Sequence, residues 1–373
     1  MPFIKSAERL FLVLLGMIAV SMSPGFCAPD SESEDTGPIV VITDMEPDDR
    51  IALHLIGAMF PERLAFIGTT VMHSFRKRML AERLMQQLGL GRVPIFQGSG
   101  GYAEDYPDIA SSRPGREYDH EGAGILQEQV LLEMADHPRS SRQLQREISR
   151  ILSDNRKVEF FLLVPTTDLA RVLEQSPELA KHISRAHLMG GWVEIGQPDS
   201  AELRTTYNWN MDPTSARQIL ESQAFPITLY SSHTIKERFS GGTVNRDNFP
   251  QLIDLLETAS GQLKSVSETL VAGGSWDHHL MDRLPQLEAV IGRENAGRQF
   301  SPADSIVVVG AFAPHFITRR SSVRIRLEAD EFDSNRGYRV FVAPSPGSKI
   351  ELVDEFDELV FQNAFVEAFE KLW

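Results

Sequence analysis

The fold of this chain is set chiefly by short apolar strands that alternate with longer helical segments. The first strand, Ile39–Thr43, is an unbroken β-branched run, as expected for a strand buried on both faces of a sheet. A helix is expected next, from about Asp48 to Met59, and the alternation then continues along the chain. This pattern predicts an α/β fold with a mostly parallel central sheet and helices on both faces.

The remaining elements are expected from the same signals of periodicity and turn residues. Further strands are expected at residues 64–70, 93–96, 158–164, 187–189 and 226–230. Helices are expected at residues 75–88, from Thr167 onward, and at 213–222, 304–311 and 355–372, with a mostly helical stretch at 249–291. Residues 323–327 and 338–342 alternate in polarity, which predicts a small antiparallel hairpin near the C-terminus. Residues 97–124 are rich in Gly, Pro, Tyr and Asp and predict a long loop.

The N-terminus has the pattern of an export signal. Lys5 and Arg9 precede the uncharged apolar residues 10–20, and small residues follow up to Ala28. The apolar run is shorter than a membrane span, so we expect residues 1–28 to be a cleaved signal peptide rather than an anchor. An acidic linker over residues 29–38 would then lead into one domain over residues 39–373. The expected location is the periplasm or the medium, with no membrane contact after cleavage.

Charge and cysteine content exclude several functional classes. The formal net charge is -15, which argues against nucleic acid and anionic membranes as partners. Cys27 is the single cysteine and lies at the expected cleavage region. Disulfides within the chain, thiol nucleophiles and cysteine-ligated zinc are therefore excluded for the mature protein.

Four acids follow the first strand within six residues, and these are Asp44, Glu46, Asp48 and Asp49. A helix N-terminus favours one or two acids through capping and the helix dipole. Four acids this close repel one another unless a positive group lies among them. Calcium prefers several oxygen ligands, so this segment predicts a site for calcium at the carboxyl end of the strand.

The same segment resembles the N-terminal signature of the inosine-uridine-preferring nucleoside hydrolases, a strand followed by Asp-x-Asp-x-x-x-Asp-Asp and a helix. Asp44, Asp48 and Asp49 match the last three acids, while Ile42 replaces the first. The resemblance continues in order over about residues 38 to 370. It is carried by the segments Ile67–Val71, Val164–Ala170, Met189–Gly191, Tyr207–Pro213, Pro302–Ile306, Ala313–Phe316 and Arg336–Gly337.

This resemblance implies a calcium-dependent enzyme that hydrolyses the N-glycosidic bond of a ribonucleoside or related N-riboside, giving free base and ribose. Asp44, Asp49 and Asp304, with the backbone carbonyl of Thr167, would ligate calcium. Asp44 would also be the general base, and Asp48 and Asn208 would bind the ribose hydroxyls. The resemblance further implies a homo-oligomer. Simpler structural roles exist for three of these positions, because Thr167 and Asp304 could be helix caps and Asn208 could satisfy loop backbone. Asp212 before Pro213 is expected to be a cap.

The departures from the family pattern concern the side of the site that would face the base. Ala303 replaces the histidine before the last aspartate, Thr206 replaces a glutamate, and the asparagine after the second strand falls on or near Ser74. Residues elsewhere could compensate. Trp276 could stack on a nucleobase, and His120, His278 or His279 could protonate the leaving group.

Two other functions compete with hydrolysis. A non-catalytic calcium-dependent binder of sugars or nucleosides would keep the acids and tolerate the changes at Ala303 and Thr206. A haloacid-dehalogenase phosphatase also places aspartates after its first strand, but it needs a second aspartate two positions on. Glu46 stands there instead, and Asp48 and Asp49 would be left without a role.

Overall fold

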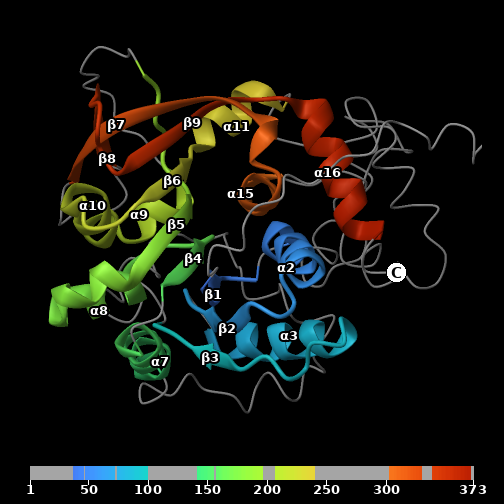
Figure 1. Cartoon of the computed structure of the whole chain (residues 1–373). Helices are drawn as coiled ribbons and strands as arrows, with labels where there is room; N and C mark the ends of the chain where they lie inside the picture. The colour runs from blue at the N-terminus through green and yellow to red at the C-terminus, as the bar shows by residue number, and fades with distance from the viewer. Residues whose placement is uncertain are drawn as a thin grey trace, which may run out of the picture. The chain divides into compact units, whose positions relative to one another are not determined.

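The computed structural model describes residues 37–45, 47–71, 74–99, 141–154, 157–195, 206–239, 302–329 and 338–370. All of these residues belong to one compact unit, Gly37–Trp373, whose elements are labelled in Figure 1.

A nine-stranded sheet forms the centre of this unit, in the order β3-β2-β1-β4-β5-β6-β9-β7-β8. The pairs from β3 to β9 are parallel, and β7 is antiparallel to both β9 and β8. The strands are β1 (Ile39–Thr43), β2 (Leu64–Thr69), β3 (Ile95–Gln97), β4 (Val158–Leu162), β5 (Ile183–Met189), β6 (Ile227–Tyr230), β7 (Ile317–Ala329), β8 (Tyr338–Pro344) and β9 (Ile350–Phe356).

Helices cover both faces of the sheet. Successive strand residues point to opposite sides, so a strand that is apolar throughout needs helices packed on each side. Val41 of β1 joins a core cluster with helices α2, α3, α15 and α16, while Val40 joins a second cluster with α7, α8 and α10. These helices are α2 (Pro47–Met59), α3 (Ser74–Gln87), α7 (Ser141–Ser153), α8 (Thr167–Gln175), α10 (Pro213–Ser222), α15 (Ala303–Phe312) and α16 (Glu358–Glu370), and the shorter ones are η2 (Pro177–His182), α9 (Tyr207–Met211), α11 (Ser232–Arg238) and η4 (Pro314–Phe316).

Helix α15 is buried along most of its length. It packs against α2 and β5, and every residue from Ala303 to Gly310 is buried. In Figure 1 α15 lies beside the strands, next to α2. A residue at the first turn of α15 is therefore held close to the first turn of α2, although the two are far apart in the sequence.

The predicted fold class is confirmed, including the C-terminal hairpin of β7 and β8. The last helix is confirmed but begins at Glu358, and strand β9, which precedes it and lies between β6 and β7, was not predicted. The short helices α9 and α11 were not predicted either. The expected loop beyond Ser99 and the helical stretch at 249–291 lie outside the described residues. Within the described ranges, no helix is both long and apolar enough to cross a bilayer.

Candidate active site

The acidic segment forms the connection between β1 and α2. Asp44 follows the last residue of β1, and Asp48 and Asp49 lie in the first turn of α2. Asp44 and Asp49 are buried and Asp48 is half-buried. The Thr43 hydroxyl donates to Asp49 Oδ1 at 2.6 Å and accepts a hydrogen bond from the Met45 backbone N–H at 3.0 Å. The carboxyl end of β1 therefore fixes where these acids point.

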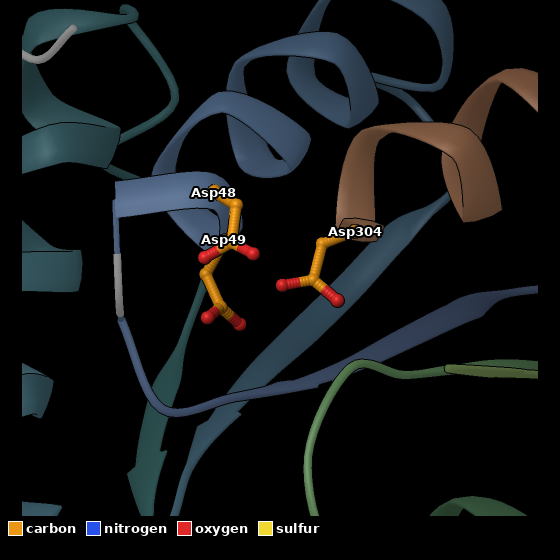
Figure 2. Close-up of side chains that lie close together, drawn as sticks. All are labelled: Asp48, Asp49 and Asp304. Carbon is orange, nitrogen blue, oxygen red and sulfur yellow. The ribbon is translucent and has the colours of Figure 1, made fainter. Parts of the chain in front are cut away.

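Asp304 joins these acids from the other end of the chain. It is buried in the first turn of α15. Asp48, Asp49 and Asp304 each offer a carboxylate oxygen, and these three oxygens lie within 4.8 Å of one another. Figure 2 shows the side chains of the three aspartates lying close together. The structure thus brings together three of the acids that the sequence singled out.

Burial and mutual repulsion raise the pKa values of two of these acids, Asp48 and Asp49. Burial, and next the charge of Asp44, raises the pKa of Asp48 to about 7. The pKa of Asp49 is raised well above its ordinary value, first by burial and then by the charges of Asp44 and Asp304. Asp44 therefore lies close to this cluster, and a bound cation would relieve the repulsion.

The donor set fits calcium. Every side chain in the cluster is a carboxylate, and hard divalent cations take oxygen ligands of this kind. Nitrogen or sulfur ligands, which would favour zinc or copper, are absent from this acidic cluster among the described residues. The cluster is thus suited to hold calcium through Asp49 and Asp304, two of the predicted ligands. Asp48, which the sequence predicted as a ribose ligand, lies within the cluster as well.

Thr167 begins helix α8 at the end of the connection from β4. Its hydroxyl donates to Asp212 Oδ2 at 2.6 Å, and Asp212 Oδ1 accepts from the Ser215 N–H at 3.0 Å. Asp212 is therefore the cap of α10, as predicted. Thr167 itself is not a cap, because the N-cap position of α8 is Thr166. The role of the Thr167 carbonyl as a metal ligand stays a prediction.

Asn208 is buried in the short helix α9 and is held at the same edge of the sheet. Its amide nitrogen donates to the carbonyl oxygens of Leu163 at 2.9 Å and Met189 at 3.2 Å, just after β4 and at the end of β5. The Leu163 N–H in turn donates to the Ile42 carbonyl, two residues before Asp44. Asn208 thus lies at the carboxyl edge that also carries the acids, where ligands bind in sheets of this type.

Two glycines make room for this arrangement. Gly190 and Gly191 follow β5 with φ values of 142° and 76°. A Cβ on Gly191 would lie 2.4 Å from the Trp209 ring. The Met-Gly-Gly segment therefore lets the indole of Trp209 pack against the backbone and sets the position of the helix that carries Asn208.

A model of the family described as "Inosine-uridine preferring nucleoside hydrolase" matches residues 39–363. The chain belongs to this family. It is a nucleoside N-ribohydrolase, and the family and fold support hydrolysis of the N-glycosidic bond of nucleosides. No curated protein sequence matches the chain.

Solved nucleoside hydrolases share the fold. A plant nucleoside hydrolase and an inosine-guanosine nucleoside hydrolase each match with a TM-score of 0.62 and 14% identity, over 89% of this chain and 98% of theirs. A purine-preferring ribonucleoside hydrolase from Gardnerella vaginalis matches with a TM-score of 0.60 and 16% identity, over 90% of this chain and 98% of its own. At these identities the similarity shows the fold alone.

The positions where this nucleoside hydrolase departs from the family pattern have structural partners of their own. The Thr206 hydroxyl hydrogen-bonds the Tyr338 hydroxyl, which also accepts from the Trp192 N–H at 3.2 Å. Ser74 donates to the Gly98 carbonyl at 3.2 Å. Ala303 is buried in the first turn of α15. Thr206 and Ser74 thus hydrogen-bond within the scaffold.

Three predicted substrate-binding residues, His120, Trp276 and His278, lie outside the described residues, as does His279, and their roles stay predictions. Sequence reasoning also missed one residue at the site. Arg50 is buried directly after Asp49 and donates from Nε to the Met45 carbonyl at 2.9 Å. A basic residue adjoining four acids was the signal that could have pointed to it.

Proposed function

We propose that this nucleoside hydrolase depends on calcium and that its acid cluster is the catalytic centre. The observation that carries the proposal is the convergence of carboxylates from α2 and α15, two helices that start at the carboxyl edge of the sheet. Burial and the neighbouring carboxylates raise the pKa values of Asp48 and Asp49, so a divalent cation is the partner that fits the cluster. Asp49 and Asp304 would be ligands, with Asp44 and the Thr167 carbonyl completing the set.

When bound, calcium would supply a positive charge that holds the vicinal hydroxyls of a ribose and makes a nearby water more acidic. Asp44 is then the general base: its carboxylate takes a proton from the attacking water as the water oxygen bonds to C1′. The bond from C1′ to the base nitrogen breaks, and its electron pair leaves with the base. The surrounding carboxylates favour the positive charge that develops on the sugar ring.

Asp48 and Asn208 would orient the sugar. The Asn208 amide nitrogen is committed to the Leu163 and Met189 carbonyls, which leaves its side-chain oxygen to accept from a ribose hydroxyl. Asp48, half-buried at the start of α2, would accept from the neighbouring hydroxyl. His120 or His278 would protonate the departing base, and Trp276 would stack on it. A base that is unstable as an anion must take up a proton as it leaves. A general acid is therefore needed most for poor leaving groups.

Turnover of p-nitrophenyl riboside tests this proposal, because its good leaving group needs little protonation. We expect hydrolysis that requires calcium and falls by at least about a thousandfold in Asp44→Asn, which keeps the shape of the side chain but cannot accept the proton. The matched control is Glu174→Gln, a change of an exposed acid on α8 that should leave the rate unaltered. Tight ribose binding without turnover by the wild type would instead identify a calcium-dependent binder.

Export is also part of the proposal, and it rests on the sequence of residues 1–28. Fractionation of cells that express the full chain should place the protein in the periplasm or the medium. N-terminal sequencing should find a start near residue 29. A cytoplasmic protein with an intact N-terminus would contradict this part and leave the catalytic proposal standing.

A further inference from the structure

The backbone just after Asp44 adopts a conformation that few side chains tolerate. Met45 has a φ of 61°, in the left-handed region, where a residue with a Cβ is disfavoured. Its side chain is buried in the core between the sheet and α2. A conformation of this kind persists only where the surrounding structure enforces it.

Two buried hydrogen bonds, one on each side of Met45, enforce it. The Met45 N–H donates to Thr43 Oγ1 at 3.0 Å, and the Met45 carbonyl accepts from Arg50 Nε at 2.9 Å. Thr43 and Arg50 are both buried. We call these two residues the Met45 clamp.

The same two residues are tied to the acid cluster. The Thr43 hydroxyl donates to Asp49 Oδ1 at 2.6 Å, and Arg50 interacts electrostatically with Asp48. The turn that carries Asp44 and the first turn of α2 are therefore joined into one unit. The direction in which the Asp44 side chain points relative to Asp48 and Asp49 depends on this unit.

We propose that Thr43 and Arg50 are positioning residues that hold the acidic turn ready for calcium, an inference that rests on the proposed function. The two possible effects of Arg50 have opposite signs. Its positive charge beside carboxylates opposes the binding of a cation, whereas its hydrogen bond to Met45 arranges the ligands and favours binding. The clamp predicts that the second effect is the larger.

Calcium binding measured by titration calorimetry separates these effects. In Arg50→Met, which keeps much of the volume of the side chain, we expect calcium to bind about tenfold more weakly than in the wild type, or about 1.4 kcal/mol. Removal of the charge alone would make binding tighter. Equal or tighter binding in Arg50→Met would overturn the clamp.

A second background shows whether Arg50 acts through the turn. Glycine adopts positive φ freely, so Met45→Gly removes the need for the clamp. Calcium binding is compared between Met45→Gly alone and Met45→Gly combined with Arg50→Met. Both proteins lack the Met45 side chain, so the effect of its loss cancels in the double-mutant cycle. We expect Arg50→Met to weaken calcium binding by less than about twofold here. The same tenfold loss in both backgrounds would show that Arg50 acts elsewhere.

Thr43 gives an independent test. Thr43→Val removes the hydroxyl at nearly constant volume and should weaken calcium binding, while Thr43→Ser keeps the hydroxyl and should restore most of it. Valine binding as tightly as wild type would contradict the role of Thr43. Wild-type protein is titrated first: no calcium binding there overturns the proposed function together with the clamp, whereas calcium binding that no clamp variant changes overturns the clamp alone.

Discussion

His54 lies fully buried on α2, one helical turn after Arg50, and its Nδ1 is 2.7 Å from the Arg50 carbonyl oxygen. Burial lowers the pKa of His54 from 6.5 to about 4. The unfolded chain binds a proton at this residue below pH 6.5, and the folded protein does so only near pH 4. The stability that neutral His54 contributes is therefore complete above pH 6.5 and is lost as the pH falls toward 4.

We expect this loss to reach about 3 kcal/mol, on the order of one proton taken up over the interval between the two pKa values. The measurement is urea denaturation at pH 7.5, 5.5 and 4.5 for the wild type and for His54→Gln. Glutamine cannot take up the proton, so the gap in stability between the two proteins should narrow as the pH falls. A constant gap would show that His54 does not titrate in this way.

The residues of the site differ in how far the sequence could predict them. Asp44, Asp48 and Asp49 stand together after a strand, and the family pattern adds Asp304 through the order of its motifs. Arg50 stood out only as a basic residue beside four acids, and His54 gave no signal, because their roles depend on the backbone of Met45 and on burial against other elements. Those features arise only when the chain is folded.

At the scale of elements, Asp168 joins four of them through one buried carboxylate. It lies in the first turn of α8 and accepts from the Thr70 hydroxyl at 3.0 Å, the Ser99 N–H and hydroxyl at 3.1 Å and the Gln145 amide at 3.0 Å. These partners follow β2, follow β3 and lie on α7. Asp168 thus fixes the start of α8, where Thr167 stands.

We expect Asp168→Ala to lower the free energy of unfolding by about 3 kcal/mol, because several buried donors would lose their acceptor. Urea denaturation measures this loss. Glu174→Gln, on the exposed side of the same helix, should change stability by less than about 0.5 kcal/mol. A similar small effect of Asp168→Ala would contradict a joining role for this carboxylate.

Helix α15 gives a second prediction at this scale, since it carries Asp304. A Cβ on Gly310 would lie 2.1 Å from the Tyr230 hydroxyl oxygen of β6, so the glycine lets α15 approach the sheet. Gly310→Ala should displace the helix, cost about 1–3 kcal/mol and weaken calcium binding. In the Tyr230→Phe background, where the clashing oxygen is gone, the cost should be smaller. An equal cost in both backgrounds would rule out the hydroxyl oxygen as the cause.

Strand β9 was not predicted, because its stability depends on contacts with strands far away in the sequence. Strand β9 contains Glu351, Asp354 and Glu355, and such acids are uncommon in strands. In the folded protein Glu351 is 2.9 Å from Arg185 of β5 and 3.5 Å from Arg320 of β7. These acids are tolerated in a strand because basic residues on other strands neutralise them. Long-range pairing of this kind cannot be derived from a local pattern.

At the scale of the whole domain, the sequence could predict a parallel sheet with two covered faces but not the order of its strands. β9 enters between β6 and the hairpin, so the last strand of the chain lies inside the sheet. The acid cluster has the same long-range character, because α2 and α15 meet on one face of the sheet. A ligand bound there should stabilise the fold as a whole.

Calcium should therefore raise the melting temperature. Binding to the folded state alone stabilises by about 2.7 kcal/mol at one hundred times the dissociation constant. For a domain of this size such a gain amounts to roughly 4 °C. Chelation should reverse the shift, and magnesium should give a smaller one, because it demands a stricter octahedral geometry and dehydrates reluctantly.

Asp304→Asn decides whether the shift comes from the cluster that joins the two helices. The variant removes one charged ligand from α15 and keeps the shape of the side chain, so most of the calcium-dependent shift should vanish. Glu174→Gln should keep the full shift. If Asp304→Asn keeps the full shift as well, calcium binds somewhere other than between α2 and α15. Neutralising a carboxylate in the shared cluster would weaken calcium binding there.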